Sequence, residues 1–370
     1  MNINFFMPTR IIMGEDCIYN NRAVLQSLGK KALIMCGKNS AKNNGSLADI
    51  VKALEANGQQ YFLHDKVMSN PTLDCVYEAA EAIKREGCDF VAALGGGSPM
   101  DASKAAACLA LNWVDKSAFF GTSFNTALPI VAVPTTAGTG SEVTPYAIIT
   151  NDQAQTKTNI GSPALFPRYA FLDAKYMLGL SREITINTAV DALSHAVEGI
   201  LSVKASPITD TLARESIAVV SGSFPTLLGN GEISLELRQK LLYGATLGGM
   251  VIAHTGTTAV HSIGYSLTYY NHIDHGRANG LVFAEFLRVI EAKEKSSPIR
   301  RIPGILSAMG LKSIDEFDKT LSSLIGKKEK FGLPELEKYA EQAMQAKNIA
   351  NCIIKLDKGE LLEILKKSIG

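Results

Sequence analysis

The first half of the chain alternates apolar runs of strand length with segments of helical periodicity, and this alternation constrains the fold more than any other feature. The apolar runs fall at residues 32–36, 61–64, 89–94 and 128–133, with helical patterns between them. Strands that alternate with helices form a parallel sheet that helices cover on both faces. We therefore predict an α/β domain with a parallel sheet over residues 1–180.

Beyond about residue 180 the strand signals largely vanish and helical periodicity dominates. Helices are expected at residues 184–202, 209–228, 234–253, 261–268, 281–293 and 333–348. This pattern predicts an all-helical domain over residues 181–370, with the boundary between residues 173 and 182. A length of 370 residues also suits two domains better than one compact core.

The charge balance and the cysteines exclude several classes of protein. With 37 basic and 36 acidic residues, the net charge of +1 gives no electrostatic footprint for nucleic acid or for an anionic membrane surface. No apolar run is long enough to span a bilayer, and the N-terminal residues do not resemble a signal peptide. Six scattered cysteines without a CxxC pair argue against a disulfide framework. We expect a cytoplasmic protein with no nucleic-acid or membrane partner.

A glycine-rich segment joins the predicted strand at residues 89–94 to the next helix. Its sequence is Gly95-Gly96-Gly97-Ser98-Pro99-Met100-Asp101, with Ser98 expected as the helix N-cap, Pro99 at the first helical position and Asp101 at the third. Glycines let the backbone approach a phosphate closely, and the N–H groups of a helix N-terminus attract an anion. A tight turn without a ligand is the alternative, because the pattern is not the GxGxxG fingerprint.

A second loop of the same kind follows the apolar run at residues 128–133. Its sequence is Pro134-Thr135-Thr136-Ala137-Gly138-Thr139-Gly140-Ser141-Glu142. Threonine and serine hydroxyls, together with glycines, can bind ribose, phosphate or amide groups. Two such loops after two parallel strands fit a dinucleotide lying across the carboxyl edge of the sheet. Both loops, with Thr139 and Asp101 among their residues, are therefore predicted to bind a dinucleotide cofactor.

The residues after the first strand bear on the choice of cofactor. NAD sites usually place an aspartate or glutamate where it meets the ribose 2′-hydroxyl of the adenosine. Here Gly37, Asn39 and Ser40 lie at the strand exit, no carboxylate is present, and Lys38 and Lys42 are close by. A 2′-phosphate would be tolerated and attracted, so we predict NADP(H) in preference to NAD(H).

Histidines are concentrated in the predicted helical half. Asp191 and His195 are four residues apart, which puts both side chains on one face of a helix. A shared metal would partner this buried pair, although an Asp–His hydrogen bond at a helix contact would also do so. His261 and His275 are fourteen apart, and a turn within residues 269–274 could fold one back toward the other. Three imidazoles and one carboxylate suit Zn(II) or Fe(II).

Together these segments resemble the iron-containing (group III) alcohol dehydrogenase family over nearly the whole chain. The resemblance implies a dehydroquinate synthase-like architecture, in which a cleft between the domains holds the metal and the nicotinamide. It implies that the metal ligands are Asp191, His195, His261 and His275. It also implies that Gly95, Gly96, Gly97 and Ser98 hold the pyrophosphate, that Thr135 and Thr136 lie near the phosphates and the nicotinamide, and that Lys157 contacts the cofactor.

The resemblance implies reversible hydride transfer between NADP(H) and a small alcohol or aldehyde, with Fe(II) or Zn(II) bound, in a homodimer. Many members of the family have a histidine four residues after the third ligand, where this chain has Tyr265. The proton relay is therefore expected to involve Tyr265 or His272. A polyol dehydrogenase that uses NAD, or a dehydroquinate synthase-like lyase, is the alternative. Arg277 is the one basic residue near a ligand, which favours a neutral substrate.

Overall fold

The computed structural model describes residues 3–370 and divides into two compact units. The first, the α/β unit, comprises residues 7–136 and 140–180. The second, the helical unit, comprises Ser181–Gly370, the residues up to Phe6 and the short segment Ala137–Thr139. The sequence pattern did not predict that the N-terminal residues and Ala137–Thr139 belong to the helical unit.

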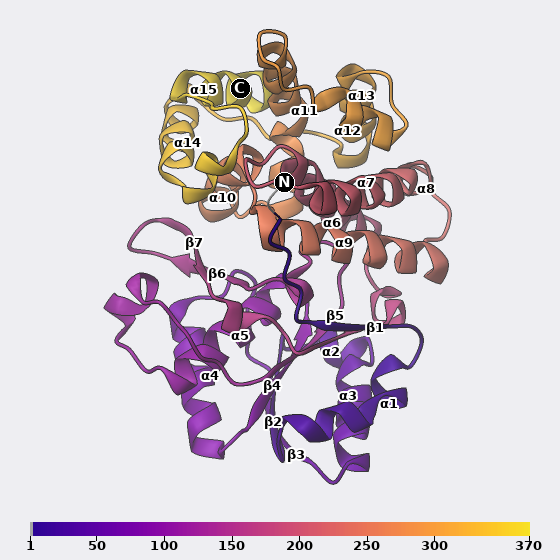
Figure 1. Cartoon of the computed structure of the whole chain (residues 1–370), viewed down its shortest axis with the longest axis vertical. Helices are drawn as coiled ribbons and strands as arrows, with labels where there is room; N and C mark the ends of the chain where they lie inside the picture. The colour runs from indigo at the N-terminus through magenta and orange to yellow at the C-terminus, as the bar shows by residue number, and fades with distance from the viewer. Residues whose placement is uncertain (1–2) are drawn as a thin grey trace. The chain divides into compact units, whose positions relative to one another are not determined.

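A six-stranded parallel sheet forms the centre of the α/β unit, in the order β1-β8-β5-β4-β2-β3 (Figure 1). Its strands are β1 (Arg10–Met13), β2 (Lys31–Cys36), β3 (Gln60–His64), β4 (Phe90–Gly95), β5 (Ile130–Pro134) and β8 (Tyr169–Leu172). A separate antiparallel hairpin consists of β6 (Tyr146–Asn151) and β7 (Thr156–Gly161). The prediction of a parallel α/β sheet is thereby confirmed.

Helices cover both faces of this sheet because the side chains of each strand alternate between the faces. On β2, Leu33 and Met35 pack with α4 and α5, whereas Ala32, Ile34 and Cys36 pack with α1 and α3. The helices of this unit are α1 (Cys17–Asn20), α2 (Ser40–Asn43), α3 (Ser46–Ala56), α4 (Leu73–Glu86) and α5 (Gly97–Leu111). Two buried apolar layers therefore fix the sheet between its helices.

The order of the strands brings three polar loops to one edge of the sheet. β2, β4 and β5 are neighbours and parallel, so the loops that follow them all leave from the carboxyl edge. These are the loops predicted to bind a nucleotide. Ligands of open α/β sheets bind at this edge.

The helical unit is built around α6, which packs against α7, α9 and α11 (Figure 1). The expected helix at residues 209–228 is instead two helices, because Pro225 at the start of α8 has no N–H with which to continue α7. The bounds are α6 (Arg182–Ile200), α7 (Pro207–Gly222), α8 (Phe224–Leu228), α9 (Leu235–Thr255), α10 (Ala259–Asn271), α11 (His275–Glu294), α12 (Ile302–Met309), α13 (Ile314–Ile325), α14 (Leu333–Gln345) and α15 (Lys358–Ile369).

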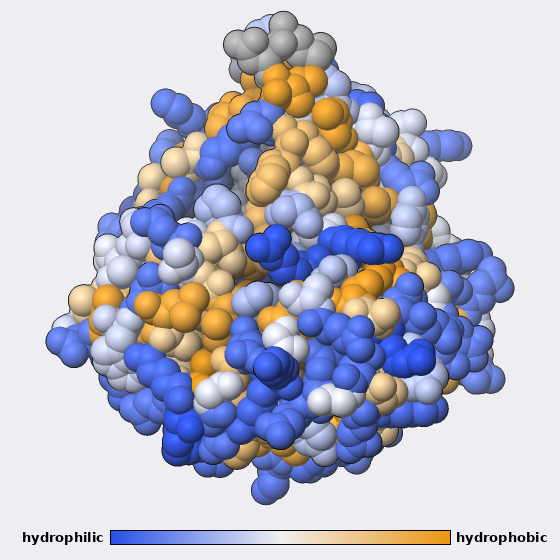
Figure 2. All heavy atoms as spheres, turned by 60° about the horizontal axis from the view of Figure 1, so that its bottom comes forward, coloured by the Kyte–Doolittle hydropathy of each residue, from blue (hydrophilic) through white to orange (hydrophobic). Residues whose placement is uncertain are grey.

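The surface shown in Figure 2 is largely hydrophilic, and hydrophilic residues interrupt its apolar areas. Within residues 3–370, no helix has both the length and the apolar character that a membrane span requires.

Candidate active site

One face of α6 carries the acidic and imidazole side chains that the sequence singled out. Ser181 caps this helix by accepting a hydrogen bond from the N–H of Ile184, and the helix continues to Ile200. Asp191 and His195 therefore project one turn apart from the same face. Both side chains are buried, with exposures of 3% and 4%.

The other two histidines lie on α10 and α11, which a short turn connects. α10 ends at Asn271, His272 adopts the left-handed conformation with φ 54°, and α11 begins at His275. The two helices pack against each other. His275, the first residue of α11, thus lies beside His261 in the first turn of α10, with 5.0 Å between the ring centroids.

One carboxylate oxygen, Oδ1 of Asp191, lies close to three imidazole nitrogens. Its distance is 3.6 Å to Nε2 of His261, 3.8 Å to Nε2 of His195 and 3.9 Å to Nε2 of His275. Ligand atoms of Asp191, His261 and His275 all lie within 4.8 Å of one another. The ring of His195 stacks on that of His261, with centroids 4.7 Å apart.

The electrostatics of this cluster suit a bound cation. Burial alone would raise the pKa of the Asp191 carboxyl, but the imidazoles around it outweigh burial and hold the pKa below its usual range. Burial lowers the pKa of His195 and so favours the neutral ring that can ligate a metal. Burial would also lower the pKa of His261, but Glu198 and Asp191 raise it to about 9. A divalent cation would replace the proton on Nε2 of His261 as the partner of the Asp191 carboxylate.

Two further polar side chains contact the cluster, and the sequence analysis gave neither a role. Glu198 lies seven residues after Asp191 on α6, and its carboxylate contacts Nδ1 of His261. Asn279 lies four residues after His275 on α11, and its Nδ2 donates to Oδ1 of Asp191 at 3.0 Å. Their helical spacing from the predicted ligands was the signal that could have identified them.

Close approach of α11 to α6 depends on Gly276, which follows the ligand His275. A Cβ atom at Gly276 would lie 1.8 Å from the backbone oxygen of Asn187 and 3.0 Å from Cβ of Asp191. Only glycine therefore allows the two helices to come close enough for Asp191 and His275 to share a ligand.

We predict that Gly276→Ala destabilises the protein by about 3 kcal/mol, because the overlapping atoms include backbone that cannot rotate away. It should also weaken Zn(II) binding, since the helices carrying two ligands must separate. Urea unfolding and Zn(II) titration would measure both effects. The matched control is Gly304→Ala in α12, where an added Cβ meets nothing within 4 Å and should stabilise by up to about 1 kcal/mol. Equal effects of the two substitutions would contradict the prediction.

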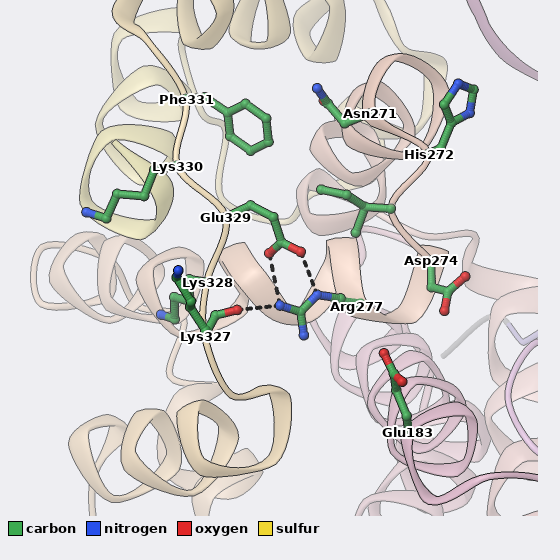
Figure 3. Close-up of a pocket in the computed structure, with 11 residues that line it drawn as sticks. Glu183, Asn271, His272, Asp274, Arg277, Lys327, Lys328, Glu329, Lys330 and Phe331 are labelled. Atoms are coloured by element: carbon green, nitrogen blue, oxygen red, sulfur yellow. Dashed lines mark hydrogen bonds and ion pairs between the residues drawn. The ribbon is translucent and has the colours of Figure 1, made fainter.

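The structure separates the two candidates for the proton relay. The ring of Tyr265 stacks on that of His275, with centroids 5.6 Å apart and an interplanar angle of 13°. His272 is exposed and lines a hollow of about 780 Å³ on the helical unit. Figure 3 shows this hollow around Arg277, whose guanidinium is paired with Glu329. Of the two candidates, Tyr265 is the one in contact with the imidazole cluster.

His254, like His272, lies outside this cluster. It stacks on Phe5 with 4.1 Å between centroids, and its Nε2 accepts the N–H of Phe6 at 3.0 Å. Its Nδ1 lies 2.8 Å from the carbonyl oxygen of Met250. His254 thus holds the N-terminal segment to α9.

In the α/β unit, the loop after β4 has the form expected of an anion site. Gly95 has φ +146°, and a Cβ there would lie 2.6 Å from Cγ of Pro99. The expectation that Ser98 caps the helix is wrong. α5 begins at Gly97 with Gly96 as its N-cap, and Oγ of Ser98 accepts the N–H of Asn70 at 3.2 Å. The extra glycine lets the helix start earlier and leaves the backbone N–H groups of its first turn at the loop.

Asp101 and Lys104, one turn apart on α5, hold the second loop in place. Oδ1 of Asp101 accepts the hydroxyl of Ser141 at 2.7 Å, and Oδ2 accepts the N–H of Ile148 at 3.1 Å. Lys104 is 1% exposed. Its ammonium donates to the carbonyl oxygen and the hydroxyl of Ser141 at 2.6 and 2.7 Å, to Thr144 at 3.1 Å and to the carbonyl of Tyr146 at 2.9 Å. Burial raises the pKa of Asp101 and lowers that of Lys104 to about 8.

The remaining predicted nucleotide residues follow β5 and lie on β7. The N–H of Thr135 donates to the carbonyl oxygen of Gly95 at 2.9 Å, which ties the two loops together. A Cβ at Gly96 would lie 2.9 Å from Oγ1 of Thr136, so these residues also adjoin. Lys157 lies on β7, close enough to Asp101 to favour its ionised form. Thr139 belongs to the helical unit.

The exit of β2 forms a basic hollow of about 530 Å³. Its lining includes Lys38, Asn39, Lys42 and Lys66, with Asp65 as the acidic member. Lys42 and Asp65 form an ion pair at 2.5 Å. Gly37 follows β2 directly and precedes Lys38 of this lining, and Ser40 begins α2. The predicted adenosine end of the cofactor site therefore carries more positive than negative charge.

The comparisons with known proteins agree with this geometry. The family model for iron-containing alcohol dehydrogenases matches residues 8–174, and the model for the C-terminal domain of that family matches residues 185–369. The chain belongs to the iron-containing alcohol dehydrogenase family. The family resemblance predicted from the motifs is thereby confirmed, as is the fold.

Relatives and solved structures extend over nearly the full length. The chain is 31% identical to 1,3-propanediol dehydrogenase of Klebsiella pneumoniae over 341 residues, which covers 90% of this chain and 86% of the relative. It is 27% identical to NAD-dependent methanol dehydrogenase of Bacillus methanolicus, covering 94% and 91%. The crystal structure of an iron-containing alcohol dehydrogenase from Thermotoga maritima is 38% identical, covers 99% of each chain and superposes with a TM-score of 0.90.

Proposed function

We propose that this alcohol dehydrogenase transfers a hydride between NADP(H) and a small neutral aldehyde or alcohol. The observation that carries the proposal is the buried group of one carboxylate and three imidazoles on α6, α10 and α11. Asp191, His195, His261 and His275 would hold Fe(II) or Zn(II). The bound cation would supply Lewis-acid polarisation of the substrate oxygen.

The chain's own residues supply charge balance and a proton path. Asp191 contributes the one negative charge of the ligand set in a buried site, so a bound divalent cation would keep a net positive charge toward a developing alkoxide. Of Tyr265 and His272, Tyr265 is the residue in contact with this group, because its ring stacks on His275. We propose that its Oη passes the proton to or from the substrate oxygen. The loops after β4 and β5 bind and orient the dinucleotide.

A preference for NADP(H) follows from the charge around β2. Lys38 and Lys42 line the hollow at this strand exit and would attract a 2′-phosphate. Residues 37–42 include no carboxylate that could accept a hydrogen bond from the ribose 2′-hydroxyl of NAD(H). Asp65 is already paired with Lys42. The relative from Bacillus methanolicus is NAD-dependent by name, so the preference has to be measured for this chain.

We predict that Gly37→Asp reduces kcat/KM with NADPH at least about tenfold, which corresponds to about 1.4 kcal/mol. The new carboxylate would face the 2′-phosphate and would accept the ribose 2′-hydroxyl of NADH instead. The substitution fits, because a Cβ at Gly37 comes no closer than 3.4 Å to its neighbours. Initial rates with both cofactors measure the ratio. Asn43→Asp at the end of α2 adds the same charge outside the lining of the hollow and should leave the ratio near the wild-type value.

A neutral substrate fits the state of Arg277. Its guanidinium donates to both carboxylate oxygens of Glu329, at 2.8 and 3.1 Å, and to the carbonyl oxygen of Lys327 at 2.5 Å. It is therefore already engaged and is a poor partner for an anionic substrate. A polyol substrate is the second candidate, favoured by the similarity to 1,3-propanediol dehydrogenase.

The first experiment is an anaerobic assay of NADPH oxidation with butyraldehyde. It would be run on the protein as isolated, after chelation, and after addition of Fe(II) or Zn(II), with NADH and 1,3-propanediol as further arms. Activity that chelation removes and one metal restores would support the proposal and identify the ion. Loss of activity in air would favour Fe(II). Failure with both cofactors over a wider aldehyde panel would overturn it.

The oligomeric state is proposed to be a homodimer. β1 is an edge strand of the six-stranded sheet, and an edge strand offers backbone groups to a second chain. Light scattering coupled to size-exclusion chromatography would show a mass near twice 39.7 kDa. A mass near one chain would contradict the proposal.

A further inference from the structure

Glu198 is a buried carboxylate that the proposed ligand set leaves without a role. It lies one turn beyond His195 on the same face of α6 and is 0% exposed. A carboxylate removed from water in this way must be compensated by donors around it. Within residues 3–370, the donors to Glu198 all belong to residues at the N-terminal end of α10.

One oxygen of Glu198 caps α10. Oε1 accepts the N–H of Thr258 at 2.9 Å, its hydroxyl at 2.7 Å and the N–H of Val260 at 3.0 Å. Thr258 is the N-cap position of this helix, and its own side chain does not cap it. The carboxylate therefore satisfies backbone donors that a helix start leaves unpaired, at the positive end of the helix dipole.

The other oxygen of Glu198 contacts an imidazole that belongs to the ligand set. Oε2 makes a short contact with Nδ1 of His261. A carboxylate can only accept, so Nδ1 must donate its hydrogen. The ring then presents Nε2, without a hydrogen when neutral, toward Oδ1 of Asp191 at 3.6 Å. The tautomer and the orientation of His261 are thus both determined from the side away from the other ligands.

We propose that Glu198 is a positioning residue for the metal site, which fixes the Nδ1–H tautomer of His261 and anchors α10 to α6. Hydrogen bonding to a carboxylate orients a ligating histidine and raises its basicity as a ligand. Because the same carboxylate caps α10, the helix that carries His261 cannot shift along α6 without losing these bonds. The inference rests on the proposed ligands but not on the cofactor or the substrate.

The test is the affinity of the full-length protein for Zn(II), measured by competition with a chromophoric chelator. Wild-type binding tests the ligand set itself, and the ratio to Glu198→Gln tests the role of Glu198. A glutamine can accept with only one of its two terminal atoms, so it must lose either the cap or the bond to His261. We expect Zn(II) to bind about 10–100-fold more weakly. Affinity within about twofold of wild type in a folded variant would overturn the proposal.

Glu294→Gln is the matched control. Glu294 is also a buried carboxylate of the helical unit, 2% exposed, and it accepts the N–H groups of Arg301 at 2.7 Å and of Ile302 at 3.3 Å at the start of α12. Its substitution removes the charge and one acceptor oxygen of a similar helix cap without touching an imidazole. Zn(II) affinity should stay near the wild-type value. An equal loss in both variants would mean that only helix capping is involved, and the proposal would fail.

A measurement on the unmodified protein keeps the proposal testable if Glu198→Gln does not fold. Histidine-selective ¹⁵N labelling and NMR of the zinc-loaded protein report the tautomer of each ring. His261 should carry its hydrogen on Nδ1, with the metal on Nε2. A hydrogen on Nε2, or metal bound through Nδ1, would contradict the role assigned to Glu198.

Discussion

Replacing His275 with alanine will weaken Zn(II) binding at least about 100-fold, since loss of even an outer partner of a ligand costs about 10–100-fold. It will also lower kcat/KM with butyraldehyde by about 1000-fold or more. Lewis-acid stabilisation contributes several kcal/mol, and each 1.36 kcal/mol corresponds to a factor of ten. Metal titration of the purified variant and steady-state rates measure the two effects.

The fold should survive this substitution better than the loss of His261 would. The side chain of His275 is 26% exposed, so its removal empties little of the core. Removing His261 would instead leave the fully buried Glu198 without its imidazole partner, and an uncompensated buried charge costs about 3–5 kcal/mol. Circular dichroism of metal-free His275→Ala should match that of the metal-free wild type.

His272→Asn is the control for His275→Ala. His272 belongs to the same turn but lies exposed at the hollow around Arg277, and asparagine tolerates its left-handed backbone. Zn(II) affinity should therefore be unchanged. If His272→Asn also released the metal, or if His275→Ala retained it, the ligand assignment would be wrong.

The parallel sheet could be predicted because its central strands are buried on both faces. Such strands consist of continuous apolar runs, as at residues 32–36, and these runs can be recognised in the sequence. The edge strand β1 and its neighbour β8 have four residues each and were not predicted. The hairpin of β6 and β7 was also missed. On β7 only Ile160 is buried, so the alternation that marks a strand is weak.

In the active site too, the features set by one helix could be predicted from the sequence, whereas those set by packing between helices could not. The spacing of Asp191 and His195 follows from one helix, so the sequence indicated it directly. That His261 and His275 lie beside them depends on a turn and on helix packing, which the family resemblance supplied and the spacing alone did not. The contacts of Glu198 and Asn279 form only when α10 and α11 pack against α6. Helical spacing places both residues on the same face as a predicted ligand, but it does not show which partners they contact.

Lys104→Met should destabilise the α/β unit by about 3–5 kcal/mol, the usual cost of leaving a buried charge without the opposite charge that compensates it. Methionine fills a similar volume, so the loss is electrostatic. The carbonyl oxygens of Ser141 and Tyr146 lose a donor, and Asp101 loses the cation that favours its ionised form. Because these groups hold the second nucleotide loop, NADPH should also bind more weakly. Urea unfolding and the quenching of NADPH fluorescence measure both.

The pH dependence of this loss identifies its cause. Burial already raises the pKa of Asp101, and removing Lys104 must raise it further. A carboxyl whose pKa is higher in the folded state binds protons on folding, so its burial costs least at low pH. The destabilisation by Lys104→Met should therefore be smaller at pH 5 than at pH 8. A loss of stability independent of pH would indicate a packing defect instead.

Two further variants separate the effect of the Asp101 and Lys104 charges on each other from the effect of their surroundings. Asp101→Asn combined with Lys104→Met removes both charges, and it should recover part of the stability that the single substitution loses, since neither charge remains unpaired. Lys116→Met breaks an exposed pair with Asp74 in the same unit and should change stability by no more than about 0.5 kcal/mol. If the loss of stability in the double variant equalled the sum of the losses in the two single variants, the two residues would act independently. The link between the two nucleotide loops would then have to reside in backbone contacts such as that of Thr135 with Gly95.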